Sequence, residues 1–139
     1  MRRLAVALPL LLASLASVGC GTSDAGTAKA AWLSPLTSDR GCATARVTVT
    51  GDQFVRGVNT FHVTFAGAAD GAFTPTELTS AAAYMPAMGH GTEPPVVAKV
   101  GDGYDVSALE LTMAGQWDVK LNLLCAGAAD AVKFSVDVR

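Results

Sequence analysis

Alternation of apolar and polar residues is the feature of this 139-residue chain that most restricts its fold. In residues 117–123 and 132–138, every second side chain is apolar and the residues between are polar. A repeat of two places the apolar side chains on one face of a β-strand, whereas an amphipathic helix repeats about every 3.6 residues. No long stretch follows the helical repeat, so the pattern predicts an all-β fold.

Five further stretches predict strands, and turn-forming residues such as Gly, Asp or Pro lie near the ends of most of them. They are residues 45–50, 58–65, 77–84, 96–100 and 104–113. In the last stretch the alternating phase shifts between Ala108 and Leu109, which predicts a β-bulge or a bend. About seven short strands with frequent turns predict an antiparallel β-sandwich, and the strand-borne Trp117 agrees with an immunoglobulin-like core.

The N-terminal residues have the pattern of an export signal. Two arginines precede an apolar run from Leu4 to Val18, which is short for a membrane span. Gly19 and Cys20 follow, and the arrangement resembles a bacterial lipoprotein signal, in which Cys20 becomes the lipidated first residue. Ordinary signal cleavage is the alternative, because Ser17 stands where such signals usually carry Leu, Val or Ile.

These patterns predict three parts of the chain. Residues 1–19 form a lipoprotein-type signal peptide, residues 20–40 a flexible tether, and residues 41–139 the β-sandwich domain. The mature protein is expected in the cell envelope, held to a bacterial membrane by its lipid and facing the periplasm or the exterior.

The cysteines are expected to form a disulfide. If Cys20 carries lipid, Cys42 and Cys125 remain, and a pair in an oxidising compartment is most simply one disulfide bond. A thiolate metal site is the competing interpretation, but neither cysteine has a second donor at ligand spacing.

Composition and motifs exclude several classes of function. The net charge of −2 gives no electrostatic footprint for nucleic acid. The sequence shows no Ser/His/Asp arrangement, phosphate-binding loop or paired carboxylates, so no catalytic residues and no enzymatic activity are predicted. Zinc is disfavoured because only His62 and His90 are available as imidazole ligands.

A short Met- and His-containing segment carries the most specific chemistry. Met85, Met88 and His90 lie within six positions, in a stretch rich in Gly and Pro that predicts a loop rather than the interior of a strand. Thioether and imidazole donors suit Cu(I), so the segment predicts a copper site. Met113 is a candidate fourth donor, because its predicted strand ends beside a turn; its phase with Leu111 favours core packing instead. His62, on the polar face of a strand, is expected to be solvated rather than a ligand.

Two motifs resemble those of YtkA-like domains. Residues 85–91, with the sequence Met-Pro-Ala-Met-Gly-His-Gly, resemble the Met-Pro-x-Met-x-His-Gly segment of that family. Residues 111–119 resemble its second signature, in which a Met, a Gly and a Trp lead into a strand. Asn59 also fits the early strand of such domains. The similarity covers residues from about 43 to 138.

This resemblance implies an immunoglobulin-like sandwich related to FixH-like proteins and linked with copper handling. Its implied ligands are Met85, Met88, His90 and Met113. FixH-like proteins usually carry a transmembrane helix, whereas this chain begins with a lipoprotein-type signal, so general copper buffering or delivery is expected rather than oxidase assembly. The partners are then a copper ion and a copper-accepting or envelope protein. The alternative is an interaction or scaffold module without metal, in which the methionines form an apolar contact surface.

Overall fold

The chain forms ten β-strands and no helix within the residues that the structure describes. The computed structural model describes residues 31–33, 35–51, 53–67 and 76–139. Its strands are β1 (Ala31–Trp32), β2 (Leu36–Thr37), β3 (Thr44–Val49), β4 (Gly57–Ala66), β5 (Thr76–Met85), β6 (His90–Gly91), β7 (Val96–Val100), β8 (Gly103–Leu111), β9 (Gly115–Cys125) and β10 (Ala128–Val138). Within these ranges no helix is long and apolar enough to cross a membrane. The predicted signal peptide and Cys20 lie outside them.

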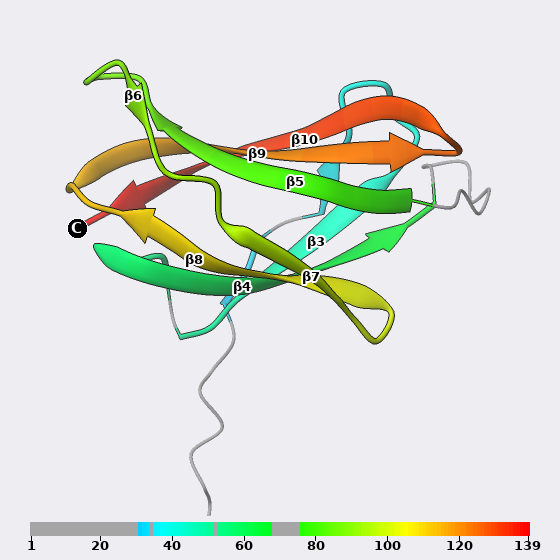
Figure 1. Ribbon diagram of the computed structural model, residues 1–139, viewed down its shortest axis with the longest axis horizontal. Coiled ribbons are helices and arrows are strands. Elements are labelled where there is room, and N and C mark those ends of the chain that lie inside the picture. The colour runs from blue at the N-terminus through cyan, green and yellow to red at the C-terminus, as the bar shows by residue number, and fades with distance from the viewer. Residues whose placement is uncertain (1–30, 34, 52, 68–75) are drawn as a thin grey trace, which may run out of the picture.

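Two antiparallel sheets pack face to face, as predicted (Figure 1). One sheet has the order β1-β3-β4-β8-β7, with β2 also paired to β3, and the other has the order β10-β9-β5-β6. Seven of the strands have five or more residues. Taken in chain order as A to G, these seven give the sheets ABED and CFG, which is the topology of constant-type immunoglobulin domains. The prediction of an immunoglobulin-like sandwich is therefore confirmed.

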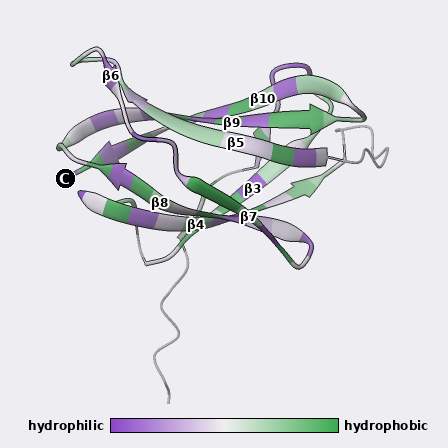
Figure 2. Cartoon of the chain, viewed as in Figure 1, coloured by the Kyte–Doolittle hydropathy of each residue, from purple (hydrophilic) through white to green (hydrophobic). Residues whose placement is uncertain are grey.

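The core lies between the sheets and consists of the inward-facing side chains of the alternating strands. Hydrophobic and hydrophilic residues follow one another along these strands (Figure 2). Residues 117, 119, 121 and 123 are buried, and so are residues 132, 134, 136 and 138. Trp117 is the largest side chain that is fully buried. Burial of a large aromatic group contributes strongly to stability, because it removes much apolar surface from water. The alternation in the sequence thus identifies the inner face of both strands correctly.

The predicted phase shift in β8 is a β-bulge. Leu109 lies opposite Asn59, whereas Val106 lies opposite Phe61, so β8 carries one residue more than β4 between these pairs. Ala108 adopts the left-handed backbone conformation at the bulge, with a φ of 58°. The extra residue lets both Val106 and Leu109 face the core although they are three positions apart.

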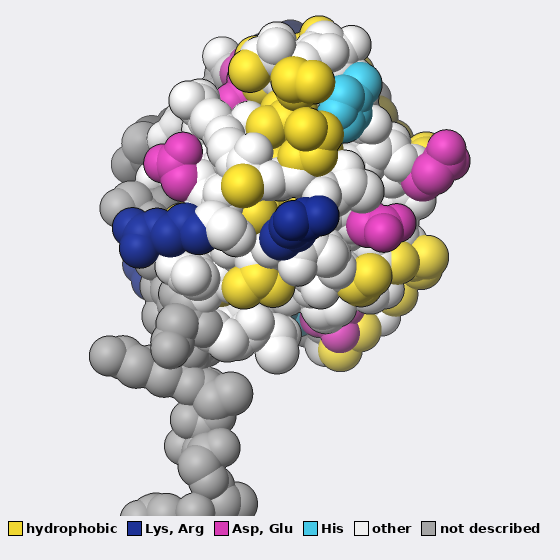
Figure 3. All heavy atoms as spheres, turned by 90° about the vertical axis from the view of Figure 1, so that its left-hand side faces the viewer, with side chains coloured by type: hydrophobic (Ala, Val, Ile, Leu, Met, Phe, Trp, Pro, Cys, Tyr) yellow, Lys and Arg dark blue, Asp and Glu magenta, His cyan; other side chains and the backbone are white. Residues whose placement is uncertain are grey.

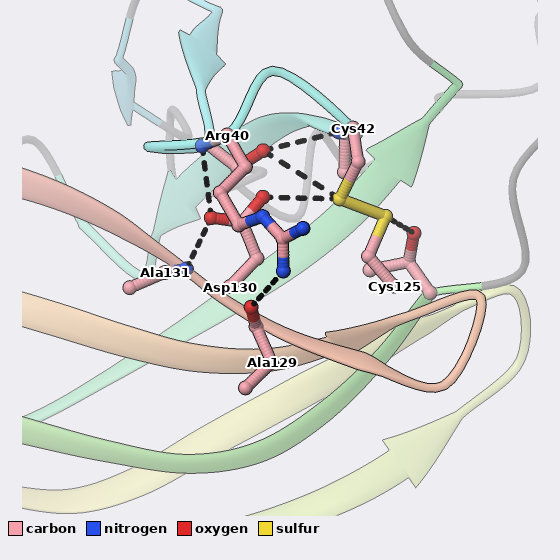
Figure 4. The surroundings of a disulfide bond; sticks show 9 residues. Arg40, Cys42, Cys125, Ala129, Asp130 and Ala131 are labelled. Carbon is pink, nitrogen blue, oxygen red and sulfur yellow. Dashed lines mark hydrogen bonds between the residues drawn. A yellow bond between two sulfur atoms is a disulfide. The ribbon is translucent and has the colours of Figure 1, made fainter.

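The predicted disulfide is present, and it joins the start of the sandwich to the end of β9 (Figure 4). Cys42 and Cys125 have Cα atoms 6.3 Å apart and are separated by 83 positions in sequence. This bond differs from the disulfide of antibody domains, which joins the second and sixth strands of the sandwich. Here one cysteine precedes the first long strand.

Asp130 lies beside this disulfide and holds the chain that leads into β3 (Figure 4). Its carboxylate accepts hydrogen bonds from the backbone N–H groups of Arg40 at 3.0 Å and Ala131 at 2.8 Å. The other carboxylate oxygen is 3.0 Å from the Cys42 sulfur, which has no proton to donate in a disulfide. Burial works against ionisation, but the hydrogen bonds from Ser38, Ala131 and Arg40 and the charge of Arg40 outweigh it, so the pKa of Asp130 lies below its usual value.

Part of the predicted tether belongs to the folded domain. Ala31 and Trp32 pair with β3, and so do Leu36 and Thr37. The backbone N–H of Asp39 also donates to the carbonyl of Ala131 at 2.8 Å. The sandwich therefore begins before residue 41, whereas residues 20–30 of the tether lie outside the described residues.

Candidate metal centre

The Met-Pro segment is a β-hairpin at one end of the sandwich. Met85, the last residue of β5, lies directly opposite His90, the first residue of β6. The turn between them is closed by two backbone hydrogen bonds to the Met85 carbonyl, from Met88 at 3.2 Å and from Gly89 at 3.0 Å. Gly89 has a φ of 67°, which few side chains tolerate, and this conformation returns the chain toward β5. The hairpin thus brings Met85 and His90 together across two strands.

Met85 is a core residue, contrary to its prediction as part of a loop. Its side chain is buried, and it continues the inward phase of Ala81 and Ala83 along β5. It lies against Gly115, the first residue of β9, where a Cβ atom would stand only 2.6 Å from the Met85 methyl carbon. Gly115 follows Met113 by two positions, so this contact joins the hairpin to the β8–β9 connection.

The ring of His90 packs against the buried Trp117. Its ring meets the indole edge to face, with centroids 5.6 Å apart and planes at 79°. Its Nδ1 is 3.3 Å from the carbonyl oxygen of Gly91. With Nδ1 donating its proton to that oxygen, the lone pair of Nε2 is free for a metal, as in most histidine ligands.

Met113 is exposed, contrary to the prediction that it packs in the core. β8 ends at Leu111, so Met113 falls in the connection to β9 rather than on the strand, and 37% of its surface is exposed. Its backbone is held, because its carbonyl accepts a hydrogen bond from Nε1 of Trp117 at 3.0 Å. Trp117 and Gly115 contact His90 and Met85, so they link the connection that carries Met113 to the Met-Pro hairpin.

Met88 lies in the turn of the hairpin with 56% of its surface exposed. The end of the sandwich that carries this hairpin shows a group of hydrophobic side chains next to a histidine (Figure 3). The exposed hydrophobic residues of the hairpin and of the β8–β9 connection include Tyr84, Met88 and Met113. The four predicted donors thus lie on one end, two in sheltered positions and two at the surface.

The donor chemistry of this end fits a soft metal ion. Among the described residues, no three His, Cys, Asp or Glu side chains group together. Glu93, the nearest acidic residue along the hairpin, is exposed. Three thioethers and one imidazole are the donors present, and these are ligands that Cu(I) accepts. The donors are therefore of a kind that Cu(I) accepts, and they lie at the same end of the sandwich.

His62 forms a separate pair on the outer face of the other sheet. Its Nδ1 is 2.6 Å from a carboxylate oxygen of Asp105, which lies directly opposite on β8. Its ring covers Gly103, where a Cβ would stand 2.6 Å from Nε2. Both side chains are about one-third exposed or more, at 34% and 42%. His62 is thus a partly exposed residue with a carboxylate partner, rather than a fully solvated one.

Trp117 and Gly115 are the two residues of this end whose role the sequence did not reveal. Trp117 was assigned to the core on its alternating phase, and that assignment is correct, yet its two ends also contact His90 and Met113. The only signal in the sequence was the spacing of Met113, Gly115 and Trp117, which follow one another at every second position.

No family model, curated protein or solved structure matches this chain. The resemblance to YtkA-like domains therefore rests on the two motifs, residues 85–91 and 111–119, together with Asn59.

Proposed function

We propose that this chain is an exported, non-catalytic Cu(I)-binding lipoprotein that buffers copper or delivers it to a partner protein. The observation that carries the proposal is the placement of Met85 directly opposite His90 across the β5–β6 hairpin. Met88 lies in the turn of the same hairpin, and Met113 is held at the same end through Trp117. Thioether and imidazole donors favour Cu(I) over divalent ions that prefer oxygen ligands.

The difference in exposure between the donors suits delivery by ligand exchange. Met85 is buried and His90 half-buried, so these two would retain the ion, whereas Met88 and Met113 are exposed. An acceptor protein with a soft donor can approach the exposed thioethers and replace them one at a time. No step requires a change in the oxidation state of the cargo, which agrees with a carrier rather than an enzyme.

A competition titration tests this proposal. The purified soluble domain is mixed with a coloured Cu(I) chelator in the presence of ascorbate, which leaves the disulfide intact. We expect the protein to withdraw one equivalent of Cu(I) from the chelator and to bind Zn(II) far more weakly. Failure to compete with a chelator of micromolar affinity would overturn the proposal.

The second candidate is an interaction module without metal. The observation in its favour is the exposure of Tyr84 (47%), Met88 (56%) and Met113 (37%) at one end of the sandwich. Exposed apolar residues that gather in one place often mark a protein contact, and methionine adapts well to such surfaces. The same titration separates the two candidates, because a contact surface has no reason to bind one equivalent of Cu(I).

A further inference from the structure

Trp117 contacts both parts of the candidate metal centre, the β5–β6 hairpin and the β8–β9 connection. One part of its side chain meets the His90 ring, at a centroid distance of 5.6 Å. Its Nε1–H donates to the carbonyl oxygen of Met113 at 3.0 Å. These two contacts join segments that are more than 20 positions apart in sequence and belong to different connections of the sandwich.

Backbone hydrogen bonds close the hairpin, and Arg56 Nε donates to the carbonyl of Thr112 at 3.0 Å, but these contacts involve neither the His90 ring nor Met113. β6 has two residues and pairs only with β5, so it forms the edge of its sheet. The other polar contact of the His90 ring is the 3.3 Å approach to Gly91, which is long for a hydrogen bond. Met113 lies in the exposed residues 112–114, between β8 and β9. The fully buried indole is the rigid group common to both.

We infer that Trp117 is the positioning residue of the copper site, which holds the His90 imidazole and the Met113 connection in their binding arrangement before the metal arrives. This inference rests on the proposed function. Trp117 is not itself a ligand, since the indole N–H is a donor only and is already used by Met113. Groups that orient metal ligands from behind commonly change metal affinity by about 10–100-fold when removed. Holding the ligands in advance also lowers the entropy lost on binding.

Fluorescence tests the inference while Trp117 itself stays unchanged. The chain has two tryptophans, so Trp32→Phe leaves Trp117 as the only indole. Ag(I), a redox-stable ion with the ligand preference of Cu(I), is titrated into this variant, and binding is measured separately by competition with the chelator. We expect the Trp117 emission to change and to saturate at one equivalent of Ag(I). Adding His90→Ala is expected to abolish most of that change.

Two results would contradict the inference, and they differ in meaning. Binding of one equivalent of Ag(I) with an unchanged Trp117 emission would overturn the positioning role and leave the copper-binding proposal intact. Absence of any binding would overturn both.

A substitution at the residue itself gives a second test. Trp117→Phe keeps an aromatic ring against His90 but removes the N–H that holds Met113. We expect it to weaken Cu(I) binding by about tenfold or more. The matched control is Phe61→Leu, which removes a buried ring whose neighbours are Phe54 and Phe134, at 5.6 and 6.3 Å.

The control separates positioning from general loss of stability. Phe61→Leu is expected to lower the thermal midpoint while it leaves Cu(I) affinity within about twofold of the parent. Equal affinity in a folded Trp117→Phe variant would contradict the inference. If Trp117→Phe does not fold, the emission of the Trp32→Phe variant decides the question.

Discussion

The methyl group of Met85 occupies the place that a side chain on Gly115 would need. A Cβ at residue 115 would lie 2.6 Å from that methyl carbon, which is closer than real Cβ contacts come. Gly115 also has a φ of 128°, a conformation that side chains rarely adopt. The candidate ligand on β5 and the first residue of β9 are therefore matched in shape.

Gly115→Ala is expected to displace the Met85 side chain and to weaken Cu(I) binding. The new methyl group forces the end of the Met85 side chain out of its position, and the side chain at a φ of 128° adds backbone strain of about 1–3 kcal/mol. Urea denaturation and chelator competition measure the two effects. Gly127→Ala is the matched control, because Gly127 also has a positive φ, of 80°, but has no atom within 4 Å of a Cβ placed there. Equal Cu(I) affinity in both variants would show that Met85 does not contribute a ligand.

Removal of the disulfide is expected to lower stability without changing Cu(I) affinity. The bond closes a loop of 83 positions, for which the chain-entropy model gives about 4.5 kcal/mol. Cys125 ends β9, whereas Gly115 and Trp117 lie at its start, so the bond and the candidate metal centre lie at opposite ends of that strand. The double variant Cys42→Ser, Cys125→Ser is compared with the parent by urea denaturation and by copper titration. A loss of affinity in a variant that remains folded would contradict this separation.

Asp130→Asn is expected to destabilise the protein at neutral pH more than in acid. The pKa of Asp130 in the folded state is lowered, so on acidification the unfolded chain takes up the proton first. The stabilisation is present above the ordinary carboxyl pKa of about 3.9 and is lost as the pH falls through the lower folded value. We expect a loss of about 1–3 kcal/mol at pH 7, because the amides of Arg40 and Ala131 lose a charged acceptor.

Urea denaturation from pH 7 down to pH 2 measures this effect. The difference between parent and Asp130→Asn should shrink as the pH falls below about 4. Asp137→Asn, an exposed carboxyl on the same strand, is the control and should have little effect at any pH. A constant difference across the whole range would argue against stabilisation through the ionised carboxylate.

The strands and the bulge could be predicted from the sequence because each is a local pattern. The alternation of apolar and polar residues can be recognised among neighbouring positions alone. The phase shift between Ala108 and Leu109 likewise marks the bulge directly. The disulfide was predictable for a different reason, since Cys42 and Cys125 were the only pair left once Cys20 was set aside.

The burial of the candidate ligands was only partly predictable from the sequence. Met85 was read as a loop residue, although its phase with Ala81 and Ala83 marks it as buried, and Met113 was read as core because the strand was extended two residues too far. The contacts of Trp117 with His90 and Met113 bring together residues from two connections. That relationship depends on how the sheets pack, and no local pattern contains it.

The copper-binding claim is tested most directly by the Cu(I) affinity of the double variant Met88→Leu, His90→Ala. Leu keeps the volume of Met but removes the sulfur, so the change is chemical rather than steric. His62→Ala is the control for loss of an imidazole, because His62 pairs with Asp105 and lies away from the hairpin. In chelator competition with ascorbate, the account predicts one bound Cu(I) in the parent and in the control, and an affinity at least about tenfold weaker in the double variant. An unchanged affinity in the double variant would contradict it.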